Sequence, residues 1–320
     1  MEVADERYGG SLDDRVASLY YSWIHHLRHP YKEGVEPFSK TLKLMWGRGS
    51  LESVVDDSKG YLRLCYLSGT KLRSLLREVR RYSDLCDDYG MVMARSLMDP
   101  FAQMVENLVE GRGEHMLRGG FMTETKSIKF WQENRSSTGI QHYYFFKMMV
   151  SYYYNSYELA GTLARKVTKL YVEGADNLTP YRYFFRSLAA WTAYGLTKRS
   201  SYLKLAKKMM TGIENFVKAG MVNCNHSLLF LHAERSAAFC KKGKNKQKVQ
   251  LAFDEAIASA TTGGYIYDQA LANERAGQYF LKLQDKELAH VYLERARQCY
   301  RDWGADGKAL QMFRMYRSLM

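Results

Sequence analysis

Proline is scarce in this chain of 320 residues, and the turns that join β-strands are missing. Only four prolines occur, so long helices can run without the interruption that a missing backbone N–H causes. We find no Asn-Gly or Asp-Gly turn between alternating β-branched runs, the usual signature of a β-hairpin. We therefore expect an all-α protein.

The cysteines lack the spacing that structural zinc sites and disulfide frameworks require. The chain has five, far apart in sequence, and no Cys-x-x-Cys pair. This pattern argues against both structures and favours a reducing compartment.

Long apolar runs are also missing. The most apolar segment, residues 143–154, is too short to span a bilayer and contains Lys147. The first seven residues are mostly polar and lack the apolar stretch of a secretory signal. We predict a soluble, cytoplasmic protein with no membrane span.

Signature motifs of nucleotide chemistry are missing as well. Residues 68–71 read Ser-Gly-Thr-Lys, but the upstream glycine and the preceding strand of a P-loop are not there. No glycine-rich kinase loop, His-Arg-Asp or Asp-Phe-Gly element occurs. We therefore predict no enzymatic activity, no catalytic residues, no cofactor and no metal.

What the chain does have is helical periodicity, clearest in residues 267–303. Small side chains at Gly277, Ala289 and Ala296 alternate with bulkier ones such as Phe280, as in the packed helical hairpin of tetratricopeptide repeats. The residues that we take as structural signatures of the repeat are Ala233, Glu234, Glu274, Gly277, Phe280, Ala289, Leu293, Ala296, Tyr300 and Trp303.

The same pattern recurs at an interval of forty residues. The first set is Glu234, Arg235, Ala237, Cys240, Phe253 and Ala256, and the second is Glu274, Arg275, Gly277, Phe280, Leu293 and Ala296. Recurrence at this interval predicts an irregular tetratricopeptide-like helical-repeat superhelix.

Apolar stripes and helix stop signals divide the rest of the chain into further helices. We expect them over residues 13–29, 37–47, 51–67, 71–88, 91–109 with a kink or break at Pro100, 121–131, 140–154, 157–174, 181–197, 200–217, 227–241, 246–260 and 309–319. Residues 134–139 form the most plausible seam. It separates an N-terminal helical-repeat half, 1–139, from a C-terminal tetratricopeptide-like half, 140–320, of one continuous superhelix.

A family resemblance enters at a recurring series of residues. The series is Asn223, His226, Leu228, Leu229, Ala233, Glu234, Ala270 to Glu274, Tyr279 to Leu281, Ala289, Tyr292, Leu293, Ala296, Tyr300, Trp303 to Ala305 and Lys308. It resembles the tetratricopeptide-like helical region of large STAND-type signalling ATPases. In that family the region follows a P-loop ATPase and precedes sensor, kinase or cyclase modules. The resemblance implies a helical arm without the ATPase.

These observations predict a non-catalytic scaffold for protein interaction and coupling in a signal-transduction ATPase or kinase system. Protein partners would bind its concave face. The alternative is a basic surface for nucleic acid or another polyanion, because the net charge is +13 and one segment is rich in lysine. The lysines of that segment are Lys241, Lys242, Lys244, Lys246 and Lys248.

Two pairs of residues suggest chemistry and also have a structural explanation. His25 and His29 stand four residues apart, as zinc ligands can, but no third ligand is identifiable. Polarity at a helix end before Pro30 explains them. Cys224 and His226 lie two apart in a turn without a third group to orient them, which argues against a thiol nucleophile.

Two further sets are expected in the helical core. Glu234 and Glu274 precede Arg235 and Arg275, so we favour ion pairing within the repeat over general acid catalysis. The tyrosines of residues 143–157 could stack on single-stranded bases, but their apolar neighbours indicate core packing.

Overall fold

The computed structural model describes residues 11–112, 114–167, 176–240 and 243–319. Within these ranges every regular element is a helix, and an isolated bridge between Arg118 and Thr123 is the one strand-like pairing. The prediction of an all-α protein is confirmed. No helix in this part of the chain is long and apolar enough to cross a membrane.

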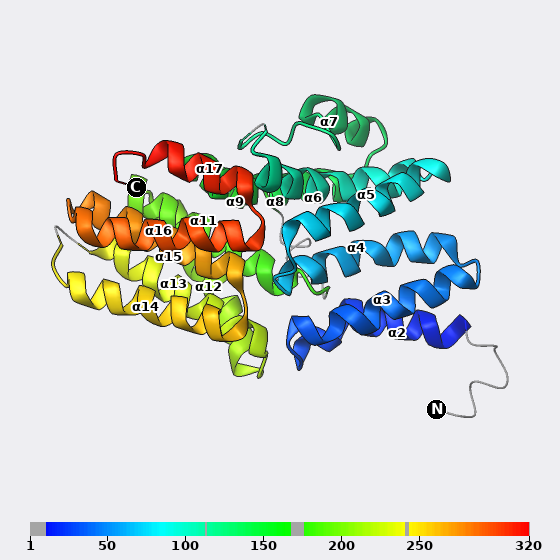
Figure 1. Cartoon of the computed structure of the whole chain (residues 1–320), viewed down its shortest axis with the longest axis horizontal. Helices are drawn as coiled ribbons and strands as arrows, with labels where there is room; N and C mark the ends of the chain where they lie inside the picture. Colours follow the sequence, from blue (N-terminus) through cyan, green and yellow to red (C-terminus); the bar gives the residue numbers. More distant parts are fainter. Residues whose placement is uncertain (1–10, 113, 168–175, 241–242, 320) are drawn as a thin grey trace.

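The helices are arranged in two parts (Figure 1). The N-terminal ones are α2 Ser11–Trp23, the 3-10 turn η1 His25–Leu27, α3 Tyr31–Gly47, α4 Leu51–Leu67, α5 Leu72–Asp88, α6 Val92–Glu110 and α7 Glu124–Glu133. The C-terminal ones are α8 Ser137–Tyr153, α9 Tyr157–Lys166, α11 Thr179–Thr197, α12 Ser200–Lys218, η2 Val222–Cys224, α13 Asn225–Phe239, α14 Lys246–Gly263, α15 Ile266–Lys282, α16 Lys286–Trp303 and α17 Asp306–Met315.

Most expected helices overlap these elements, with differences in their bounds. The helix expected over 157–174 is described to Lys166, and residues 168–174 lie outside the described residues. The helix expected over 121–131 spans Glu124–Glu133. Other differences occur at prolines. Tyr31, directly after Pro30, begins α3, and Pro37 lies inside that helix instead of opening it. Pro100 likewise lies within a continuous α6. The helix expected over residues 13–29 ends at Trp23, and η1 follows it. The predicted boundary after residue 139 falls in the first turn of α8.

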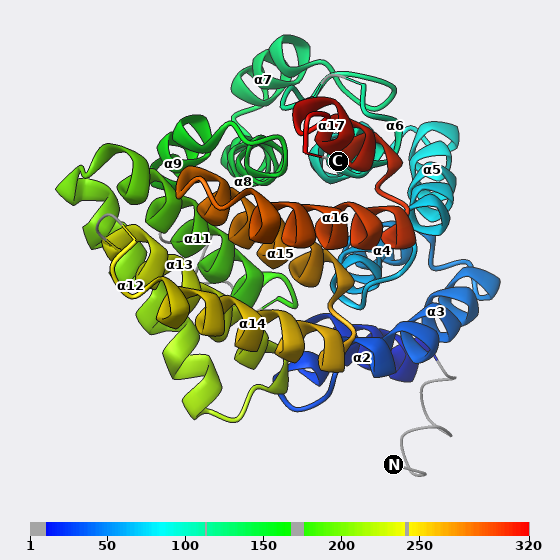
Figure 2. The same cartoon turned by 60° about the vertical axis from the view of Figure 1, so that its left-hand side comes forward.

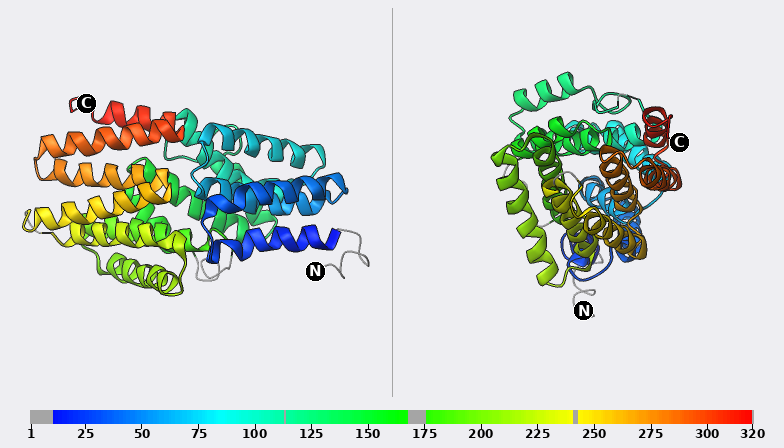
Figure 3. Two further views of the ribbon diagram at one scale, coloured as in Figure 1. Left: turned by 60° about the horizontal axis from the view of Figure 1, so that its bottom comes forward. Right: turned by 90° about the vertical axis from the view of Figure 1, so that its left-hand side faces the viewer.

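Consecutive hairpins of the C-terminal part pack side by side in chain order, α8–α9, α11–α12, α13–α14 and α15–α16. Figures 2 and 3 show these hairpins lying next to the N-terminal helices α2 to α5. The last helix, α17, then packs on α6, and a Cβ placed on Gly307 would lie 2.0 Å from the backbone N of Gly111. Only glycine permits so close an approach of two backbones.

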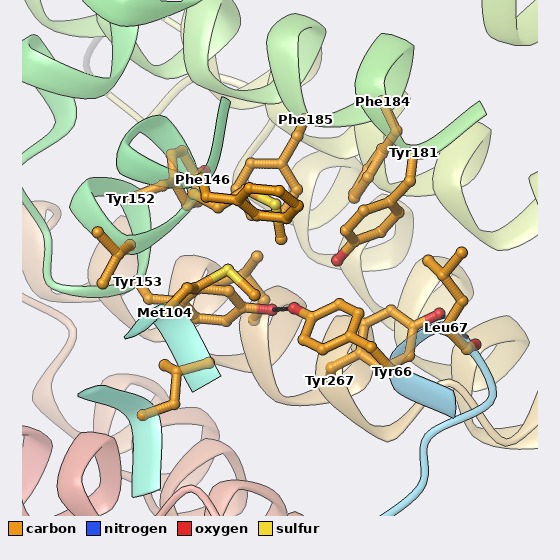
Figure 4. Close-up of a cluster of buried hydrophobic side chains, with 14 of the residues drawn as sticks. Tyr66, Leu67, Met104, Phe146, Tyr152, Tyr153, Tyr181, Phe184, Phe185 and Tyr267 are labelled. Carbon is orange, nitrogen blue, oxygen red and sulfur yellow. Dashed lines mark hydrogen bonds between the residues drawn. The ribbon is translucent and has the colours of Figure 1, made fainter. Parts of the chain in front are cut away.

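The two parts meet in a cluster of buried aromatic side chains (Figure 4). The hydroxyls of Tyr66 in α4 and Tyr153 in α8 form a hydrogen bond of 2.8 Å. Tyr66 also stacks on Tyr267 of α15 with ring centroids 5.3 Å apart. The Tyr267 hydroxyl donates to the carbonyl oxygen of Leu67 at 2.8 Å. Tyr181 of α11 packs against the same rings. Large aromatic side chains dominate core energetics, so this cluster stabilises the contact between the two parts.

The cluster fills the space between α4, α8, α11 and α15. Tyr153, Tyr181 and Tyr267 point into it from α8, α11 and α15, and all three are buried. The binding of a protein partner to a concave face stays a prediction.

Candidate functional site

The two repeat glutamates form buried ion pairs between successive elements. Glu234 of α13 accepts from Nε of Arg275 at 2.6 Å and from the hydroxyl of Thr192 at 3.3 Å. Its partner is therefore the arginine of the next hairpin and not the adjacent Arg235. Glu274 accepts from Nζ of Lys308 at 2.7 Å. The interpretation as ion pairing is confirmed, with different partners.

The small and aromatic signature residues pack the last hairpin. A Cβ on Gly277 would lie 2.6 Å from Cγ of Leu293, so α15 and α16 approach closely at this point. Phe280 stacks on Tyr292 with ring centroids 5.4 Å apart. The remaining signature residues, Ala233, Ala289, Ala296, Tyr300 and Trp303, are buried. All of them serve packing.

Cys224 and His226 occupy structural positions. Burial raises the pKa of the Cys224 thiol to about 12, so the reactive thiolate is disfavoured. Nε2 of His226 lies 2.9 Å from Oδ2 of Asp268, and its ring stacks on that of Tyr265 with centroids 3.7 Å apart.

The tyrosines expected in the core include Tyr152 and Tyr153, which are fully buried, as predicted.

The lysine-rich segment is only partly described by the structure, because Lys241 and Lys242 lie outside the described residues. Lys246 forms an ion pair with Asp285 and lies over the ring of Phe280, 5.6 Å from its centroid. Lys244 and Lys248 are exposed. These two remain candidates for contact with an anionic partner.

A cleft of about 730 Å³ opens where the two parts of the chain meet, and sequence analysis did not identify it. We call it the junction cleft. Its lining comes from α2, α4, α6, α8, α11 and the residue Asp176: Arg15, Leu19, Ser22, Trp23, Asp56, Asp57, Lys59, Gly60, Arg63, Leu97, Ser137, Thr138, Gln141, His142, Asp176 and Arg182. This volume is in the range of small-molecule and peptide-anchor pockets.

The floor of the junction cleft holds two arginines on one carboxylate. Nη1 and Nη2 of Arg182 donate to the carboxylate of Asp176 at 2.7 and 2.8 Å, and Nη1 of Arg63 donates to the same carboxylate at 3.1 Å. Burial would raise the pKa of Asp176, but the two arginines and the Thr179 hydroxyl outweigh it and lower that pKa to about 2. The carboxylate is therefore ionised at neutral pH.

His142 completes the floor as a neutral imidazole. Its Nδ1 lies 2.8 Å from the carbonyl oxygen of Leu97, so this nitrogen carries the proton and donates it. Nη2 of Arg63 lies 3.3 Å from Nε2, which accepts. Burial and the nearby Arg63 charge place the pKa of His142 well below its usual value. The described floor thus contains two arginines, one carboxylate and a neutral imidazole.

The mouth of the junction cleft adds apolar surface and a helix N-terminus. Trp23 and Leu19 of α2 are 45% and 41% exposed. Ser137 and Thr138 belong to the first turn of α8, where the helix dipole and unpaired backbone N–H groups favour negative charge. The cleft therefore combines a polar floor and an anion-attracting wall with an apolar rim.

Sequence reasoning missed this site because its residues come from distant segments. One signal was present: Arg63 stands between Leu62 and Leu64, and Arg182 follows Tyr181 in an aromatic stretch. A basic residue within an apolar helical run often marks a buried, paired charge.

Comparisons of the chain with protein-family models, with curated proteins and with solved structures find no match.

Proposed function

We propose that this chain is a non-catalytic, cytoplasmic scaffold for protein interaction and coupling, the helical arm of a signal-transduction ATPase or kinase system. The observation that carries the proposal is the junction cleft, because its walls belong to both parts of the chain. A segment bound there contacts α2 and α4 on one side and α8 and α11 on the other. One partner segment therefore contacts both parts at once, as coupling between them requires.

The cleft favours one class of partner segment. The N-terminus of α8 in its wall suits a carboxylate of the partner, from an Asp or Glu side chain. The exposed Trp23 and Leu19 suit an apolar side chain next to that carboxylate. We therefore expect a short acidic-apolar segment of a protein partner in the cleft.

Fluorescence anisotropy with labelled peptides tests this function. The probe is a peptide in which Asp and Glu alternate with Leu and Phe, and its control has Lys at the acidic positions. We expect saturable binding of the acidic peptide alone. Trp23→Ala should weaken it by about tenfold or more, as for an aromatic anchor. Trp46→Ala, a matched control that is 44% exposed on α3, should not.

Thr138→Asp separates binding from folding. A carboxylate at the second position of α8 stabilises the helix by about 0.3–1 kcal/mol. In the cleft the same charge repels the acidic peptide, whereas Thr138→Asn adds no charge. A variant that is at least as stable as the wild type and binds the peptide equally well would contradict the proposal, as would equal binding of the lysine peptide.

The second candidate is a basic surface for nucleic acid or another polyanion. It is favoured by the exposed Lys244 and Lys248 and the net charge of +13. Affinity for single-stranded DNA should then fall steeply with salt, and the Lys244→Glu and Lys248→Glu exchanges should weaken it. An affinity for DNA that neither exchange changes would exclude this surface as the binding site.

A further inference from the structure

A second cluster of possible ligand residues lies at the corner between η1 and α3, outside the junction cleft. One ligand atom each of His25, His29 and Glu33 lies within 4.8 Å of the others. The imidazoles of His25 and His29 are stacked with centroids 4.8 Å apart. Nδ1 of His29 lies 3.8 Å from Oε2 of Glu33. The structure thus supplies the third ligand that was missing from the sequence pattern.

His25 is the fixed member of this cluster. Its side chain is buried, and its Nδ1 has no hydrogen-bond partner among the described residues. A Cβ on Gly34 would lie 3.0 Å from this Nδ1, so the nitrogen faces the first turn of α3, which also carries Glu33. A buried polar atom without a partner is costly, and a bound ion would satisfy it.

The other two members are free to adjust. The side chains of His29 and Glu33 are 49% and 53% exposed. Ligand bonds of about 2.1 Å in a tetrahedral site place two ligand atoms about 3.4 Å apart. To reach this separation from the present 4.8 Å, the two exposed side chains would rotate towards His25.

We propose that His25, His29 and Glu33 bind one divalent transition-metal ion, with Zn²⁺ the ion that suits two imidazoles and one carboxylate best. Water fills the remaining position. Burial and the neighbouring His29 lower the pKa of His25, which keeps its imidazole in the neutral, metal-binding form.

A metal at this corner would also act on a distant helix connection. Nδ2 of Asn223 donates to the carbonyl oxygens of His26 and His29 at 2.9 and 2.8 Å, and its Oδ1 accepts from the backbone N of Tyr31 at 3.1 Å. Asn223 belongs to η2, between α12 and α13. An ion that fixes η1 to the first turn of α3 therefore stabilises the contact with η2.

Calorimetric titration of the metal-free full-length chain with ZnCl₂ tests the site. We expect one Zn²⁺ per chain, and a tetrahedral visible spectrum when Co²⁺ replaces it. His29→Asn and Glu33→Gln change exposed side chains, so both variants should fold. Each should weaken Zn²⁺ binding by about tenfold or more. The melting temperature should rise with Zn²⁺ in the wild type and rise less at the same Zn²⁺ concentration in both variants.

Two controls address Zn²⁺ binding elsewhere on the surface. Glu36→Gln removes an exposed carboxylate of the same helix, and His290→Asn removes an exposed histidine of α16. Both should bind Zn²⁺ like the wild type. The proposal is overturned if the wild type binds no ion, or if either His29→Asn or Glu33→Gln retains wild-type affinity.

Discussion

At the scale of single residues, several buried charged side chains of this chain form ion pairs with one another. Lys308 and Glu274 are both fully buried, and Tyr300 also donates to Glu274 at 2.9 Å. Removing one member of such a pair leaves a charge without compensation in a medium of low dielectric constant. These residues therefore matter more for stability than their exposed counterparts.

Lys308→Met should lower the free energy of unfolding by about 3–5 kcal/mol, because Glu274 then remains buried and unpaired. The double variant Lys308→Met with Glu274→Gln should recover much of this loss. Urea unfolding measures the free energy of unfolding of the wild type and of both variants. Lys40→Met is the control, since its pair with Glu36 is exposed and such pairs contribute about 0–1 kcal/mol. Equal losses in the two single variants would contradict the prediction.

His26 should make folding sensitive to mild acid. Burial lowers its pKa to about 4, with the nearby Asp176 opposing the shift. The unfolded chain binds this proton near pH 6.5 and the folded chain does not, so stability is present above pH 6.5 and is lost as pH falls towards 4. The expected contribution is a loss of about 2 kcal/mol between pH 8 and pH 5.

Urea unfolding at both pH values checks this contribution. His26→Gln should show a smaller loss of stability than the wild type, whereas the exposed His290→Gln should follow the wild type. The buried His142, with its lowered pKa, acts in the same direction and remains in both variants. A His26→Gln variant with the wild-type pH dependence would show that another group is responsible.

At the scale of helices, contact between α15 and α16 depends on a missing side chain. Gly277→Ala would place its Cβ 2.6 Å from Cγ of Leu293, and overpacking of this kind costs about 1–3 kcal/mol. Gly47→Ala in the last turn of α3 meets nothing within 4 Å, and alanine is the better helix former by about 1 kcal/mol. The midpoints of urea unfolding should therefore move in opposite directions. Equal midpoints would mean that Leu293 moves away from the added Cβ without a loss of stability.

The helices themselves could be predicted from the sequence, because apolar stripes and glycine stops are local signals. Pro37 misled the prediction, since a proline inside a helix is rarer than one at its start. Trp46 follows the apolar stripe of α3, but it is 44% exposed beside an open groove. Whether a neighbouring helix covers such a position depends on tertiary packing, which the stripe does not encode.

The sites were harder to predict for the same reason. Arg63, His142 and Asp176 lie in three distant segments, and only the fold gathers them. Glu33 follows His29 at the spacing of one helical turn, yet Pro30 between His25 and Glu33 indicated that the helix had ended. η1 does end at Leu27, and the three side chains come together because α3 begins again at Tyr31, directly after the corner.

At the scale of the whole molecule, the two parts of the chain form one cooperative unit if the aromatic cluster holds them together. Tyr66 contributes to this cluster from α4 and contacts rings of α6, α8, α11, α15 and α16. Truncation to alanine should cost about 3–5 kcal/mol, as for other large aromatic side chains in cores. Tyr89→Ala is the matched control, because Tyr89 is 58% exposed.

The shape of the unfolding transition tests the same point. If the cluster couples the two parts, tryptophan fluorescence and far-ultraviolet circular dichroism should report one coincident transition in the wild type and in Tyr89→Ala. Tyr66→Ala should lower the midpoint and separate the two signals, because the contact between the parts is weakened while each keeps its own hairpins. A lower midpoint with the signals still coincident would mean that the remaining rings suffice for coupling. Two separate transitions in the wild type would show that the parts unfold independently, and binding in the junction cleft could then not be transmitted through the cluster.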